Sequence, residues 1–104
     1  MSNEKTYITI TGLKYYAGSE SFNPGMILKM KKDRKNQYDD EAIAVYAIRG
    51  GKYGYVANSV HTVCRGSHSA GYVYNLFEDE TYCRVMFICE DLVIAEMIGD
   101  DVDE

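Results

Sequence analysis

Residues 36–45 read Asn-Gln-Tyr-Asp-Asp-Glu-Ala-Ile-Ala-Val and mark the point where a polar turn passes into a strand. Asn36 and Asp39 are turn formers, because their short side chains hydrogen-bond to nearby backbone. The apolar residues that follow, over 42–48, are typical of a strand. This stretch therefore predicts a polar turn, which holds Tyr38 and Asp39, followed by a strand.

Strand patterns continue on both sides of this turn. Alternating, β-branched or continuously apolar segments predict strands over 7–11, 26–31, 42–48, 53–57, 82–89 and 92–98. Residues 94–98 also fit a helix, and the β-branched start of this run favours the strand. Gly50-Gly51 predicts a tight hairpin of the primed type, because glycine tolerates the positive φ that such turns require. Helical spacing predicts one short helix from Asn58-Ser59 to Gly66 and another over 70–77. Together these elements predict a mainly β (α+β) fold, a small six-stranded half-open β-barrel with two short helices.

Length and composition indicate one globular domain. The chain has 104 residues, of which 46% are hydrophobic and 26% charged. We expect a single domain over 1–104, with its core in 5–98 and an acidic tail in 99–104. No apolar run is long enough to span a membrane and residues 1–6 show no signal-peptide core, so we expect a cytoplasmic protein without membrane association.

The net charge of −5 hides an uneven distribution. Residues 12–58 hold eight basic and five acidic side chains, a net +3, while the remainder holds three basic and eleven acidic ones, a net −8. The positive segment is where an anionic partner would bind, and the alternative is an ordinary solvated surface.

Signatures of enzymes and metal sites are weak or missing. No nucleotide-binding glycine motif, zinc-protease motif or nucleophile elbow occurs. Residues 39–41, Asp-Asp-Glu, and the spaced set His61, Cys64 and His68 are the only candidate metal ligands. The carboxylates are better interpreted as solvated surface, and the histidines as hydrogen-bonded or exposed side chains. The three cysteines form no Cys-x-x-Cys pair, so we expect buried apolar thiols rather than disulfides or zinc. We expect no enzymatic activity, no cofactor and no metal.

Aromatic and basic residues occur together in three places. Lys14-Tyr15-Tyr16 follows the first strand, Lys35-Asn36-Gln37-Tyr38-Asp39 occupies the long turn, and Tyr55 lies after the Gly-Gly hairpin. Flat rings stack on unpaired bases while cations follow the phosphates, so this combination is typical of single-stranded nucleic-acid binding. A tyrosine-rich surface also suits a protein interface, and a protein-interaction or assembly module is the alternative.

These segments resemble the motifs of HIRAN domains. Residues 12–18, Gly-Leu-Lys-Tyr-Tyr-Ala-Gly, resemble the opening motif of the family, and residues 36–45 resemble its Asn-Pro-Tyr-Asp-x-x-Ala-Ile-x-Val motif. Residues 52–56 resemble its Gly-Tyr/His strand, and 69–77 with 85–96 resemble the stand-alone bacterial members. The resemblance implies an OB/SH3-like barrel that captures the 3′ end of single-stranded DNA.

The resemblance also implies roles for particular residues. Tyr15 and Tyr16 would line the pocket, with Tyr15 stacking on a terminal base, and Tyr38 would help to sandwich the terminal nucleotide. Asp39 would accept a hydrogen bond from the 3′-hydroxyl. The remaining implied nucleic-acid contacts, some of them to phosphate, are Lys14, Lys35, Asn36, Tyr55 and Asn58. Gln37 stands where the family has proline, and Asn58 where it often has a basic residue.

Overall fold

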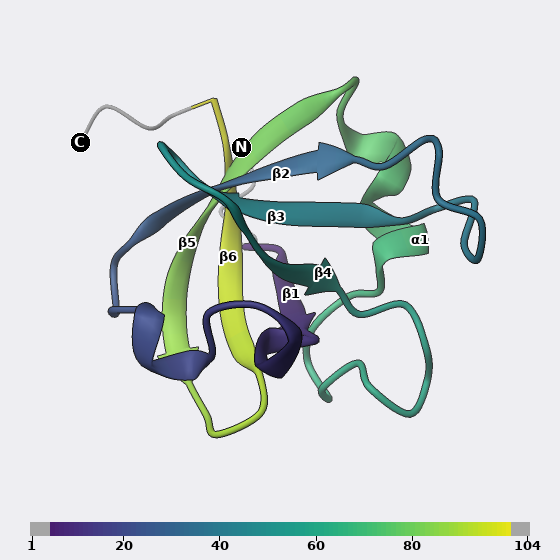
Figure 1. The fold of residues 1–104 in the computed structure, drawn as a ribbon. Helices are drawn as coiled ribbons and strands as arrows, with labels where there is room; N and C mark the ends of the chain where they lie inside the picture. The colour runs from purple at the N-terminus through teal and green to yellow at the C-terminus, as the bar shows by residue number, and fades with distance from the viewer. Residues whose placement is uncertain (1–4, 101–104) are drawn as a thin grey trace.

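Six antiparallel strands wind into a closed barrel with the neighbour order β1–β4–β3–β2–β5–β6, and β6 pairs back onto β1 (Figure 1). The computed structural model describes residues 5–100. The strands are β1 (Tyr7–Thr11), β2 (Ile27–Lys32), β3 (Ile43–Ala47), β4 (Lys52–Val56), β5 (Glu80–Ile88) and β6 (Val93–Gly99). All six predicted strands are confirmed to within two residues at each end.

The barrel is closed, whereas the sequence predicted a half-open one. Four positions of β1 pair with β6, from Tyr7 opposite Glu96 to Ile10 opposite Val93. The end of β1 also pairs with β4, where Thr11 lies opposite Tyr55. Register shifts in the β3–β4 and β5–β6 pairs mark bulges, which bend strands and let a small sheet close on itself.

Aliphatic side chains fill the interior of the barrel. Every strand contributes inward-facing residues, which are Ile8, Ile10, Leu28, Met30, Ile43, Val45, Val56, Cys83, Val85, Val93 and Ala95. Each fully buried large aliphatic side chain stabilises the fold by about 1.5–3 kcal/mol. Burial raises the pKa of the Cys83 thiol to about 12, so it behaves as the expected apolar residue. Cys64 is half-buried and Cys89 exposed, so that expectation was wrong for Cys89.

The first predicted helix does not form. Residues 58–66 make turns, in which the amides of Thr62 and Val63 both bind the Ser59 carbonyl. Val60 is 89% exposed, so this residue adds nothing to an apolar helix face, and short helices depend on packing of such a face. The loop is instead tied to β1, because the Thr9 hydroxyl accepts a hydrogen bond from the Cys64 amide at 3.1 Å.

The second predicted helix is present in two short pieces. An α-helix, α1 (Ala70–Val73), passes directly into a 3₁₀ helix, η3 (Tyr74–Leu76). The Ser69 hydroxyl caps α1 by accepting from the Tyr72 amide. Two further 3₁₀ turns, η1 (Leu13–Tyr15) and η2 (Ser19–Ser21), follow β1.

The Gly50-Gly51 hairpin joins β3 to β4, but not by a primed turn. Neither glycine has a positive φ, and the Ala47 amide binds the Gly51 carbonyl at 3.0 Å. Because β3 ends at Ala47 and β4 begins at Lys52, the loop has four residues and does not need the strained two-residue geometry.

The predicted acidic tail falls mostly on residues 101–104, which lie outside the described residues. Gly99, assigned to the tail, still pairs with Tyr82 as the last residue of β6. No helix within residues 5–100 is long and apolar enough to cross a membrane.

Gly54 allows β4 to approach the end of β1 closely. A Cβ atom at this position would lie 2.5 Å from the Thr11 carbonyl oxygen and 3.3 Å from Leu13 Cδ2. We expect Gly54→Ala to lower the free energy of unfolding by about 1–3 kcal/mol, because backbone must move to admit the methyl group. Chemical denaturation measures the change. Gly51→Ala is the matched control, since a Cβ there meets nothing within 4 Å; equal losses would contradict the close-approach argument.

Candidate nucleic-acid interface

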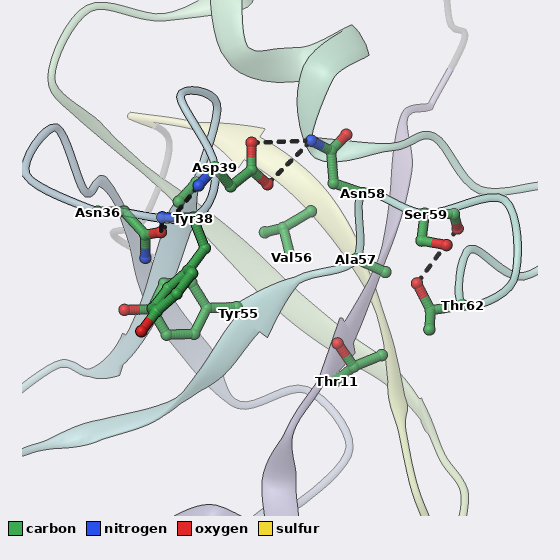
Figure 2. Close-up of a pocket in the computed structure, with 11 residues that line it drawn as sticks. Thr11, Asn36, Tyr38, Asp39, Tyr55, Val56, Ala57, Asn58, Ser59 and Thr62 are labelled. Atoms are coloured by element: carbon green, nitrogen blue, oxygen red, sulfur yellow. Dashed lines mark hydrogen bonds between the residues drawn. The ribbon is translucent and has the colours of Figure 1, made fainter.

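A hollow of about 570 Å³, here called the tyrosine hollow, opens where the β2–β3 connection meets the end of β4 (Figure 2). Its lining residues are Thr11, Asn36, Tyr38, Asp39, Ala42, Tyr55, Val56, Ala57, Asn58, Ser59 and Thr62. Figure 2 shows the rings of Tyr38 and Tyr55 at one end of this hollow, and Thr11 and Thr62 at the other. Segments far apart in the sequence therefore form one site.

Asn36 shapes the turn that carries Tyr38 and Asp39. Its side-chain oxygen accepts hydrogen bonds from the backbone amides of Tyr38 and Asp39, at 2.9 and 3.0 Å. Its amide nitrogen donates to Asp33 Oδ2 at 3.3 Å. This is the turn chemistry that the sequence predicted for Asn36. The turn holds the backbone of Tyr38 while leaving its ring outside.

The Asn58 side chain links the turn that holds Asp39 and Glu41 to the start of α1. Its Nδ2 donates to Asp39 at 3.0 and 3.3 Å and lies 3.4 Å from Glu41 Oε1, while its Oδ1 accepts from the Gly71 amide at 2.8 Å. The Glu41 amide donates to Asp39 Oδ1 at 2.9 Å. A carboxylate offers about four acceptor positions, so Asp39 is held in place and keeps acceptor capacity.

Three of the four tyrosines predicted to bind nucleic acid have exposed rings. Tyr38 is 93% exposed and Tyr15 74% exposed, and Tyr16 is also exposed. Large rings at the rim of a concave site offer apolar area that a flat ligand can bury. Some of the many tyrosines therefore lie on the surface, while Tyr53 packs on Phe22 against the core.

Tyr55 belongs to a hydrogen-bonded network that the sequence analysis missed. Its hydroxyl donates to Asp33 Oδ2 at 2.7 Å and accepts from Lys52 Nζ at 2.8 Å. Lys52 Nζ also lies 4.6 Å from the Tyr55 ring centroid and 5.9 Å from those of Tyr16 and Tyr46. Asp33 and Lys52 therefore hold the Tyr55 ring in place through its hydroxyl.

Each ionisable group of this network has a shifted pKa. The Tyr55 hydroxyl, and then the Asn36 amide, lower the pKa of Asp33. The hydrogen bond to Tyr55 raises the pKa of Lys52, and burial raises that of Tyr55. Near neutral pH, Asp33 and Lys52 are charged while the phenol keeps its proton.

A bulge explains why the sequence did not reveal the network. Residues three apart on a regular strand face opposite sides, so Lys52 and Tyr55 were not expected together. Val45 pairs with Gly54 whereas Tyr46 pairs with Lys52, so one extra residue of β4 stands between them. The extra residue brings Lys52 to the outer face of Tyr55.

The nine predicted binding residues fall into neighbouring groups. Five of them line the tyrosine hollow, which are Asn36, Tyr38, Asp39, Tyr55 and Asn58. Lys14 and Tyr15 line a second hollow of about 620 Å³, the Lys14 hollow, which shares Thr11 and Thr62 with the first. The Tyr16 ring faces Lys52, and Lys35 lines a third hollow on the outer face of β3.

The predicted histidine and cysteine spacing does not produce a ligand set. His68 stacks on Tyr72, with ring centroids 4.1 Å apart and planes 15° apart. Among residues 5–100, no three His, Cys, Asp or Glu side chains gather in a way that could hold a metal ion.

A family model for the HIRAN domain matches residues 3–65, more than half of the chain and all nine predicted binding residues. The chain belongs to the HIRAN domain family. HIRAN domains are known as DNA-binding modules, which is compatible with a chain that has no catalytic activity.

Two crystal structures resemble this HIRAN domain. One is a protein from Lactobacillus plantarum, with a TM-score of 0.63, 20% identity and 88% of each chain covered. The other is the HIRAN domain of human HLTF, with a TM-score of 0.60, 20% identity, and 93% of this chain and 77% of that chain covered. At this identity the likeness shows a shared fold. No curated protein matches the sequence.

Removal of the Tyr55 hydroxyl should raise the pKa of Asp33 toward its ordinary value of 3.8, because the hydroxyl is its main hydrogen-bond donor. An NMR titration of the Asp33 carboxyl carbon in Tyr55→Phe measures this. Tyr16→Phe, whose hydroxyl makes no hydrogen bond to Asp33, is the control and should leave the titration unchanged.

The same substitution should affect stability in one pH window. A carboxylate whose folded pKa is depressed stabilises the fold above its unfolded pKa and loses that contribution as the pH falls. The stability difference between wild type and Tyr55→Phe should therefore be constant at neutral pH and shrink below pH 3.8. A difference that grows on acidification would contradict this assignment.

Proposed function

We propose that this HIRAN domain is a non-enzymatic module that binds single-stranded DNA and takes the 3′ end of the strand into the tyrosine hollow. One observation carries the proposal: the rings of Tyr38 and Tyr55 line the same hollow as the anchored Asp39 carboxylate. Its volume of about 570 Å³ falls within the range of small-ligand sites.

The rings supply affinity without sequence preference. Every base has a flat π-face, and stacking of one base on an aromatic side chain is worth about 1–3 kcal/mol. Tyr38 is available because its ring is almost fully exposed, and Tyr55 is immobilised by Asp33 and Lys52. A terminal base has one free face and enters such a site at the lowest unstacking cost. Tyr15, on the adjoining Lys14 hollow, would stack on a terminal base.

The carboxylates supply recognition of the end. Asp39 is an acceptor-only group that Asn58 orients, so it pairs with a donor such as a free 3′-hydroxyl. Glu41 lies beside the same Asn58 amide, which places a second negative charge next to the hollow. A terminal phosphate would face both charges, so a hydroxyl end is favoured over a phosphorylated one.

A short oligonucleotide with a free 3′-hydroxyl should bind about tenfold more tightly than the same strand ending in a 3′-phosphate, because only the hydroxyl donates to Asp39. Fluorescence anisotropy with a 5′ label measures both affinities. Asp39→Asn should remove most of the difference. Asp40→Asn makes the same charge change on an exposed neighbour outside the hollow and should preserve it. Equal binding of both ends by wild type would refute end recognition.

Tyr38→Ala should weaken binding about tenfold for oligonucleotides of any sequence, since one stacking surface is lost. The free energy of unfolding of this variant should equal that of wild type, because the Tyr38 ring is almost fully exposed. Phe87→Ala is the control, since it removes another exposed ring that lies outside the hollow. If wild type binds no oligonucleotide and forms a stable oligomer that buries Tyr15 and Tyr38, the alternative of a protein-interaction module holds instead.

A further inference from the structure

The outer face of β2 and β3 forms a third hollow, here called the basic hollow, of about 530 Å³. Four cationic side chains line it, Lys31, Lys32, Arg34 and Lys35, together with the carboxylates Asp33 and Asp79. The local balance is therefore positive on a protein whose net charge is −5. None of these cations lines the tyrosine hollow, which has no cationic side chain of its own.

Strand register places the basic hollow directly beside the tyrosine hollow. Tyr55 lies opposite Ala44, and Ala44 lies opposite Lys31, so the three form one row across β4, β3 and β2. Adjacent strands are about 4.8 Å apart, which puts Lys31 roughly 10 Å from Tyr55. The small side chain of Ala44 leaves the depression between two long neighbours. Asp33, bound to the Tyr55 hydroxyl, also lines the basic hollow, so the two hollows meet at this pair.

Two of the four cations already have partners inside the protein. Arg34 forms a salt bridge with Asp79 at 2.8 Å. Lys32 Nζ donates to the Phe77 carbonyl at 2.8 Å and lies 4.3 Å from the Tyr74 ring centroid. Lys31 and Lys35 are exposed and form no salt bridge with any residue between 5 and 100. Both ammonium groups are therefore available to an anion from outside.

The opposite side of the tyrosine hollow is much less favourable for a polyanion. The Lys14 hollow holds one lysine but three carboxylates, those of Glu20, Glu90 and Asp91. A strand leaving the tyrosine hollow across this surface would bring its phosphates toward net negative charge, whereas the basic hollow offers net positive charge.

We propose that the nucleotides preceding the captured 3′ end run over the basic hollow, with their phosphates bound by Lys31 and Lys35. This inference rests on the proposed function, because it assumes that the terminal nucleotide occupies the tyrosine hollow. It assigns the affinity for longer strands to a surface distinct from the one that recognises the end. Lys52, between the rings of Tyr55 and Tyr46, is a third cation at the junction.

The test compares a dinucleotide with an eight-nucleotide strand, both with free 3′ ends, in wild type and in the double variant Lys31→Gln/Lys35→Gln. Wild type should bind the longer strand more tightly. The double variant should lose about fivefold in affinity for the longer strand and almost nothing for the dinucleotide. Its salt dependence should be shallower by about 1.4 in the slope of log affinity against log salt, because two phosphate contacts are gone.

Lys5→Gln/Arg65→Gln is the matched control, since it makes the same charge change at two exposed positions outside both the tyrosine and basic hollows. An equal loss of affinity for the longer strand in this control would show that only the net charge matters, and would overturn the inference. The inference would also fail if Lys14→Gln no longer bound the longer strand more tightly than the dinucleotide while Lys31→Gln/Lys35→Gln still did. That result would place the strand over the Lys14 hollow.

The two proposals fail in different ways. If wild type does not distinguish free from phosphorylated 3′ ends, the proposed function fails. If wild type distinguishes the two ends but Lys31→Gln/Lys35→Gln binds the longer strand as tightly as wild type does, only the proposed path over the basic hollow fails. Thermal unfolding of each variant checks that these exposed substitutions leave the fold intact.

Discussion

The barrel depends on β1, which pairs with β6 along one side and with β4 along the other. A strand with two partners leaves no unpaired edge, so the sheet closes around its aliphatic interior. Gly54 makes the β1–β4 contact possible, because a side chain there would meet the Thr11 carbonyl. Antiparallel pairing of β4 with β3 brings the end of β4 next to the β2–β3 connection, and this lets Asn58 reach Asp39.

The site combines two charge environments that a net charge cannot describe. The carboxylates of Asp39 and Glu41 share the Asn58 amide beside the tyrosine hollow, and this is where we propose that a hydroxyl donor binds. Lysines on the outer face of β2 and the following turn provide positive charge about two strands away. In the binding mode that we propose, the strand end and the phosphates behind it would each meet a surface of suitable charge.

Some features were accessible to sequence reasoning because they are local. Alternating apolar residues predicted some strands, since burial of one face imposes a two-residue period, and apolar runs predicted the last two. Asn36 and Asp39 predicted the turn, since their side chains bind backbone two or three residues away. Other predictions failed where distant groups compete: Thr9 captures the loop around Cys64 that was expected to be helical, and a four-residue loop replaces the expected primed hairpin turn.

The sequence by itself determined the strand segments, the turn that carries Tyr38 and the candidate binding residues, because these depend on neighbours along the chain. Only the tertiary structure decided that the barrel closes and that Asn58 joins Asp39. It also decided that a bulge in β4 turns Lys52 toward Tyr55, and that Lys14 and Lys35 lie in different hollows. These outcomes depend on strand order and register, which pair residues far apart in the sequence and leave no periodic trace within any one segment.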